Sequence, residues 1–147
     1  MPEITFAIRP EYGAPYCLAD DPRMQTLGNW MTTDISIYKS VCLDALATVA
    51  DAEAGRPTEP WDSDNYEVHF SSSAMSFQNK WVETTHGEYT ITEAREAIED
   101  YWRFLVSIPD NPDLIREFRP DLPEWQADLL QWEDSWKRPH PYRGKLF

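Results

Sequence analysis

The strongest helix signal in the chain is TITEAREAIEDYWRFLVSI, residues 90–108. Thr90 and Glu93 have the Ser/Thr-x-x-Glu spacing of a capping box, which satisfies free N–H groups at the start of a helix. Apolar residues then recur at three- and four-residue steps and give the helix one face for a core: Ala94, Ala97, Ile98, Tyr101, Leu105 and Ile108. Because Pro109 ends the pattern, we predict a helix over residues 92–108.

A second main helix is indicated before this segment, and a C-terminal helix after it. Residues 33–54 repeat small and branched apolar residues at helical steps, with a threonine available as a cap and Gly55 to close the helix. Residues 123–137 carry a tryptophan-rich stripe along one face: Trp125, Leu129, Trp132 and Trp136. A shorter helical piece is predicted over residues 111–118.

Alternation of apolar and polar residues at period two indicates strands at residues 3–8, 65–70, 74–77 and 80–83. The side chains expected to face the core are Met75, Phe77 and Trp81 or Val82. Residues 9–31 contain several prolines and are predicted as loop, with one short strand near residues 16–19. The expected fold is α+β: an antiparallel sheet of about four or five strands, two main helices packed on it and a Trp-rich C-terminal helix.

The chain is strongly acidic. Its 147 residues contain 26 Asp and Glu against 13 Lys and Arg, for a net charge of -13. Such a surface repels phosphate, so we expect no nucleic-acid or membrane partner, and it attracts cationic proteins. The alternative is that the acidic surface serves only to keep the protein soluble.

The length and the charge distribution predict the domain organisation. A chain of this length is expected to form one globular domain, over residues 1–137. The last residues carry Lys137, Arg138, Arg143 and Lys145, with no acid from residue 135 onward. We therefore expect residues 138–147 to form an extended basic tail, which either lies back on the acidic body or stays mobile.

The compartment is predicted from the N-terminus and the cysteines. The first residues lack the positive start and apolar run of a signal peptide, and no stretch has the length and apolarity of a membrane helix. We therefore expect a cytoplasmic protein. In that compartment Cys17 and Cys42 are expected to be free thiols that behave as small buried hydrophobes.

Three histidines, His69, His86 and His140, are the side chains best suited to proton transfer near neutral pH. None lies in a catalytic signature, and no zinc spacing or phosphate loop is present. The acidic segment 62–64 resembles the start of a calcium loop but fails at the later glycine and glutamate positions. We expect no cofactor and no metal. An enzyme that uses His86 or His69 with a carboxylate remains a third reading.

The capping-box helix predicts an acidic outward face that carries Glu96, Glu99, Asp100 and Arg103. Trp102 lies beside these residues, off the core stripe. An exposed aromatic residue among carboxylates is the composition of an interface anchor. The alternative is that Trp102 packs beneath the C-terminal helix, whose tryptophan stripe needs a partner.

The expected order of elements is a helix at 33–54, an acidic loop with Trp61, strands at 66–81 and the closing segment 89–105. This order resembles small bacterial immunity proteins of contact-dependent and polymorphic toxin systems, and also YacL-type proteins of unknown function. It covers roughly residues 30–108. Immunity proteins share no catalytic residues, so the resemblance implies a role, binding and blocking a cognate toxin, and no site positions.

Charge and resemblance together predict an immunity protein that neutralises a basic, nucleic-acid-acting toxin by electrostatic docking. Its carboxylates would lie where phosphates otherwise bind in the toxin. The expected contact residues are Asp62, Asp64, Glu67, Glu96, Glu99, Asp100 and Trp102. The alternative is a protein-binding adaptor or self-associating structural domain that uses the Trp-rich C-terminal helix. The oligomeric state stays open.

Overall fold

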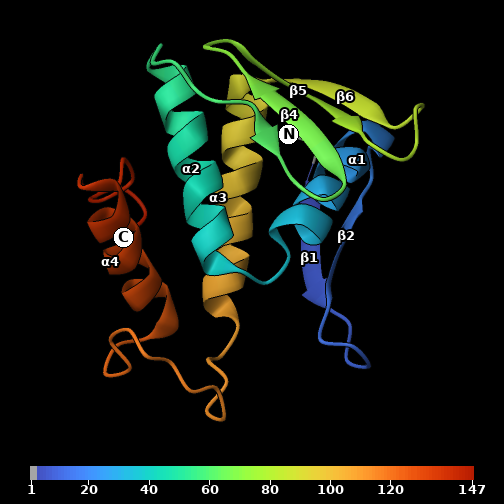
Figure 1. The fold of residues 1–147 in the computed structure, drawn as a ribbon. Coiled ribbons are helices and arrows are strands. Elements are labelled where there is room, and N and C mark those ends of the chain that lie inside the picture. The colour runs from blue at the N-terminus through green and yellow to red at the C-terminus, as the bar shows by residue number, and fades with distance from the viewer. Residues whose placement is uncertain (1–2) are drawn as a thin grey trace.

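The fold is taken from a computed structural model, in which residues 3–147 are described. These residues form four α-helices and two antiparallel sheets (Figure 1). The helices are α1 (Pro22–Trp30), α2 (Lys39–Glu53), α3 (Ile91–Ser107) and α4 (Glu124–Trp136), with a π-helical segment η1 (Met31–Ile35) after α1. The strands are β1 (Ile4–Ile8), β2 (Pro15–Ala19), β3 (Trp61–Asp62), β4 (Tyr66–Phe70), β5 (Ala74–Asn79) and β6 (His86–Thr90).

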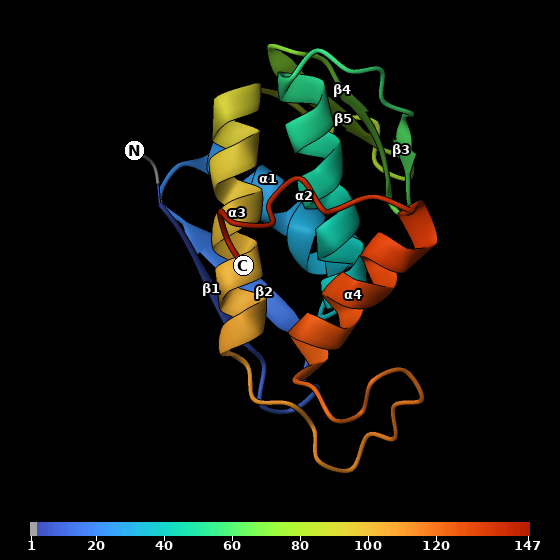
Figure 2. The ribbon, with the colours of Figure 1, turned by 90° about the vertical axis from the view of Figure 1, so that its left-hand side faces the viewer.

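The α+β prediction is confirmed, with the strands divided between a β1–β2 hairpin and a four-stranded sheet in the order β3-β4-β5-β6. Helices α2 and α3 lie side by side at the centre, with α4 on the far side of α2 (Figures 1 and 2). The larger sheet covers one end of this helix pair, and the hairpin packs beside α3. Within residues 3–147, no helix is long and apolar enough to cross a bilayer.

Helix α3 forms as its sequence pattern predicts. The Thr90 hydroxyl accepts a hydrogen bond from the Glu93 amide at 3.0 Å, and the Glu93 carboxylate accepts one from the Thr90 amide at 3.0 Å. The core stripe is buried at Ala94, Ala97, Ile98, Tyr101 and Leu105. The capping box and the buried apolar face therefore both specify the same helix.

We expect Thr90→Ala to lower the free energy of unfolding by about 1 kcal/mol, because it leaves the Glu93 amide without its cap. Urea denaturation measures the loss. Thr84→Ala is the matched control, since Thr84 is exposed in the turn before β6. A loss at position 90 no larger than the loss at position 84 contradicts the capping role.

Helix α1 lies inside the segment that was predicted as loop. The Asp21 carboxylate accepts a hydrogen bond from the Arg23 amide at 2.9 Å and caps the helix. Pro22 occupies the first helical position, where a missing N–H group leaves no bond unmade. The proline therefore begins a helix here, and the loop prediction for these residues is wrong.

The helix predicted over residues 33–54 starts only at Lys39. The Thr33 hydroxyl donates to the Asn29 carbonyl at 2.7 Å, so it binds back to the preceding helix and does not cap the next one. Ser36 then has a positive φ of 56°, outside the helical region, and separates η1 from α2. The chain from α1 to α2 is thus two helical segments joined by a turn.

The predicted strand at residues 80–83 is a turn. The Asn79 side-chain carbonyl accepts hydrogen bonds from the amides of Trp81 at 2.8 Å and Val82 at 2.9 Å. This Asx turn directs Trp81 outward, where its side chain is 74% exposed. The last strand is instead β6, which the alternation pattern did not predict. The short helix predicted over residues 111–118 is also absent.

The extended conformation predicted for residues 138–147 is wrong, because these residues form turns that pack back onto the helices. The buried His140 ring places Nε2 2.8 Å from the Leu43 carbonyl and accepts at Nδ1 from the Tyr142 amide at 3.0 Å. Phe147 packs edge-on against Trp102, with ring centroids 5.4 Å apart. The tail therefore covers part of the core.

Both cysteines are free and buried, as predicted. Cys17 lies where β2 meets α1, and a Cβ atom on Gly28 would lie 2.6 Å from its sulfur. Burial raises the pKa of both thiols. These groups are packing residues in the fold.

Candidate functional site

The seven predicted contact residues lie in separate groups. Glu96, Glu99, Asp100 and Trp102 are on α3, whereas the other three are at β3 and β4: Asp62, Asp64 and Glu67. Figure 2 shows β3 and α3 on opposite sides of α2. The cavities that these residues line contain members of one group only: Glu96, Glu99 and Asp100 in two of them, and Asp62 or Glu67 in two others.

Two of the α3 residues are used inside the fold. Trp102 is buried, at 3% exposure, so its expected role as an exposed anchor is wrong. Its ring is covered by Phe147 of the tail. The Glu99 carboxylate accepts a hydrogen bond from the Tyr142 hydroxyl at 2.7 Å and lies 3.6 Å from Arg95. Both residues hold the tail against α3.

Glu96 and Asp100 line a cavity of about 350 Å³ between α3, β1 and α1, which we call the acidic pocket. Its carboxylates are Glu3, Glu93, Glu96 and Asp100. Its apolar lining is Ile4, Phe6, Met24 and Ala97. Such a pocket suits a long cationic side chain, which can lay its apolar stem on the lining and place its charge among the carboxylates.

Helix periodicity and one strand assemble the pocket. Positions 93, 96, 97 and 100 fall on one face of α3, because residues three and four apart are neighbours on a helix. Strand β1 is held beside this face by Phe6, whose ring lies 4.8 Å from that of Tyr101 and 5.6 Å from that of Phe104. Glu3, just before β1, thereby joins the carboxylates of α3.

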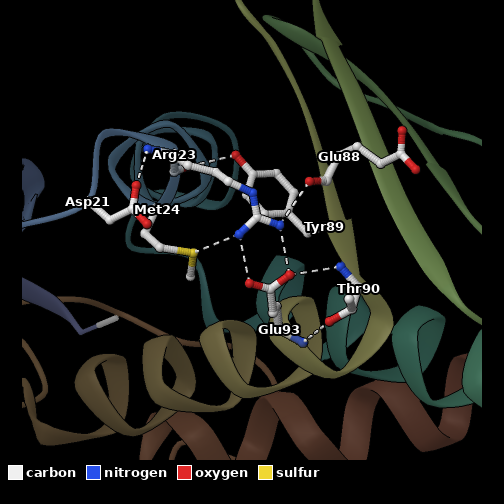
Figure 3. Close-up of polar contacts among 7 residues, drawn as sticks. All are labelled: Asp21, Arg23, Met24, Glu88, Tyr89, Thr90 and Glu93. Carbon is white, nitrogen blue, oxygen red and sulfur yellow. Dashed lines mark hydrogen bonds and ion pairs between the residues drawn. The ribbon is translucent and has the colours of Figure 1, made fainter. Parts of the chain in front are cut away.

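Glu93 is fixed by Arg23, as Figure 3 shows. The guanidinium donates from two nitrogens to the two carboxylate oxygens, each at 2.7 Å, and donates to the Glu88 carbonyl at 3.0 Å. It also lies 4.7 Å from the centre of the Tyr89 ring. The Arg23 hydrogen bonds are the main cause that lowers the pKa of Glu93 to about 2.

The remaining carboxylates of the pocket differ in their partners. Asp100 pairs with Arg103 at 2.7 Å on the open surface. Glu3 and Glu96 have no ion pair or side-chain hydrogen bond among residues 3–147. The pocket therefore keeps an excess of negative charge that a partner's cation can neutralise.

The Arg23–Glu93 pair predicts a pH-dependent stability. The pKa of Glu93 falls from 4.5 to about 2 on folding, so the pair stabilises the fold above about pH 5 and loses that effect as the pH falls toward about 2. Urea unfolding should show a constant deficit for Glu93→Gln near neutral pH that shrinks between about pH 5 and 2. The control is Glu88→Gln, whose side chain is exposed. A deficit unchanged at pH 2 contradicts the assignment.

The second group of predicted contact residues either pairs with neighbouring side chains or faces solvent: Asp62, Asp64 and Glu67. Asp62 forms an ion pair with Lys80, and Glu67 lies 3.0 Å from the His69 ring nitrogen on the exposed side of β4. Asp64 accepts a hydrogen bond from the Trp81 indole at 3.2 Å, but through its backbone carbonyl. These residues are a dispersed acidic surface.

Within residues 3–147, none of the three histidines both lines a hollow and has its ring paired with a carboxylate. His69 and Glu67 are each 55% exposed. His86 lines a hollow of about 700 Å³ between β6 and α1, and no hydrogen bond or ion pair joins its ring to a carboxylate within the described range 3–147. His140 is buried, and burial lowers its pKa.

Sequence reasoning found two carboxylates of the acidic pocket, Glu96 and Asp100, and missed Glu3 and Glu93. The capping-box pattern had already named Glu93, but as a helix signal. Comparisons with family models, curated proteins and solved structures gave no match to this chain.

Proposed function

We propose that this protein is an immunity protein that binds and neutralises a basic, nucleic-acid-acting toxin by electrostatic docking. The observation that carries the proposal is the acidic pocket on α3, where Glu3 and Glu96 stand without a basic partner in the described chain over an apolar lining. The net charge of -13 steers a cationic protein toward this surface.

The two other readings have less support from the geometry. An adaptor that uses the tryptophan stripe of α4 needs several exposed rings, but only Trp136 is exposed, at 60%, whereas Trp132 is 7% exposed and Trp125 is half-buried. An enzyme that uses His86 or His69 needs a carboxylate and a hollow at the same histidine. Binding through the acidic pocket requires neither exposed tryptophan rings nor a histidine.

The proposal is tested by capture from a lysate of the native host on the immobilised chain at low salt, followed by a salt step. We expect one basic protein, encoded next to this gene, to elute and to be toxic when expressed alone. Its dissociation constant should rise steeply with salt, since screening weakens exposed charge pairs. Absence of such a protein, or binding that is insensitive to salt, contradicts the proposal.

A further inference from the structure

A second cavity lies between α2, the 57–62 segment and α4, with a volume of about 600 Å³. We call it the tryptophan groove. Its lining includes three indole rings, four carboxylates and one guanidinium: Trp61, Trp132, Trp136, Asp44, Asp51, Glu59, Asp62 and Arg138. Figure 2 shows the C-terminal end of α4 below β3 and beside α2, which brings these elements together. The groove is separate from the acidic pocket and shares no residue with it.

The rings give the groove open aromatic surface. Trp132 and Trp136 lie on successive turns of α4, with ring centroids 6.0 Å apart. Trp136 is 60% exposed, although tryptophan is the largest apolar side chain. Trp61 is half-buried and rests edge-on against the buried Trp30, with ring centroids 6.1 Å apart. The more exposed rings of Trp136 and Trp61 thus each pack against a buried tryptophan ring.

The carboxylates give the groove a negative charge. Asp44 accepts a hydrogen bond from the Trp132 indole at 2.8 Å, and burial raises its pKa. The Asp62 carboxylate forms an ion pair with Lys80. Glu59 has no ion pair or side-chain hydrogen bond among residues 3–147. Aromatic faces beside carboxylates favour a cation that can stack.

The chain itself shows which cation this chemistry accepts. The guanidinium of Arg138 lies 5.2 Å from the centre of the Trp132 ring, at one edge of the cavity, and donates to the Asp51 carboxylate at 2.8 Å. Arginine can stack on a ring and bond a carboxylate with the same planar group, which lysine cannot do. The groove offers the same two features again at Trp136, an exposed ring, and at Glu59, a carboxylate with no ion pair among residues 3–147.

We propose that the tryptophan groove binds an arginine side chain of the basic partner, stacked on Trp136 and directed to Glu59 and Asp44. The inference rests on the proposed function for the source of the arginine. It adds a second docking point with a defined specificity, for guanidinium over ammonium. The acidic pocket has no tryptophan in its lining.

The test uses Nα-acetyl-L-arginine amide as the probe and the indole N–H signals of the seven tryptophans as the readout in a ¹H–¹⁵N spectrum. We expect saturable shifts at Trp61 and Trp136 and none at the buried Trp30. The lysine amide should bind more weakly, and the neutral citrulline amide should give no saturable shift. Trp136→Ala and Glu59→Gln should each weaken binding about threefold to tenfold, the range of a cation–π contact or a charged hydrogen bond.

Trp81→Ala and Glu83→Gln are the matched controls, because both residues are exposed and outside the groove. Circular dichroism checks that each variant is folded. Equal shifts with citrulline or lysine, or no shift at the groove indoles, overturn the inference. Because the probe is a small molecule, these outcomes do not depend on whether a toxin partner is found, and failure to capture a toxin leaves the probe result intact.

Discussion

Replacing Glu96 and Asp100 together by lysine is expected to weaken binding of the basic partner at low salt by at least about a hundredfold. The two substitutions reverse the charge on one side of the acidic pocket and oppose the cation that enters it. Titration of the captured protein by calorimetry measures the effect. The free energy of unfolding should change little, since the exposed Asp100–Arg103 pair contributes about 1 kcal/mol at most.

The matched control is Glu11→Lys with Asp113→Lys. Both residues are exposed, neither lines the acidic pocket, and the double variant changes the net charge by the same amount. It should lose only the steering contribution and bind within about tenfold of the unchanged chain. Equal losses in the two double variants would show that net charge alone governs binding and that the acidic pocket has no special part.

Trp102→Ala is expected to lower the free energy of unfolding by about 3–5 kcal/mol, as for other large buried aromatic residues. The substitution removes the ring against which Phe147 packs and leaves a cavity beneath the tail. Chemical denaturation at equilibrium measures the loss. Trp81→Ala makes the same change at an exposed position and should cost no more than about 1 kcal/mol.

The same variant separates the two roles considered for Trp102. Under conditions where it remains folded, its affinity for the basic partner should stay within about threefold of the unchanged chain, since no ring is lost from the surface. A stability close to that of the unchanged chain together with a large loss of affinity would restore the exposed-anchor role and contradict the burial described here.

Elements with agreeing local and tertiary signals could be predicted from the sequence. Helix α3 has a capping box and a core stripe that both specify the same segment, and the C-terminal helix was likewise found at its observed position. Helix α1 was missed because Pro22 was read as a breaker, although Asp21 before it is a capping residue. The turn at Asn79 was missed because the apolar Trp81 and Val82 imitate a strand.

Contacts between distant segments account for the rest. Burial of Trp102 depends on Phe147, 45 positions later in the chain, and nothing in the helix pattern shows which residue covers it. The aromatic residues of the tail, His140, Tyr142 and Phe147, were the available signal, but prolines and basic residues suggested an extended chain. Glu3 joins Glu96 only because β1 packs on α3. The helix pattern therefore identified two of the four carboxylates of the acidic pocket, Glu96 and Asp100.

Growth of cells that express the captured toxic protein together with this chain tests the central claim most directly. The account predicts that the unchanged chain and the Glu11→Lys, Asp113→Lys variant restore growth, whereas the Glu96→Lys, Asp100→Lys variant, present at the same level, does not. Restored growth with the Glu96→Lys, Asp100→Lys variant, or continued toxicity with the unchanged chain, would contradict neutralisation through the acidic pocket.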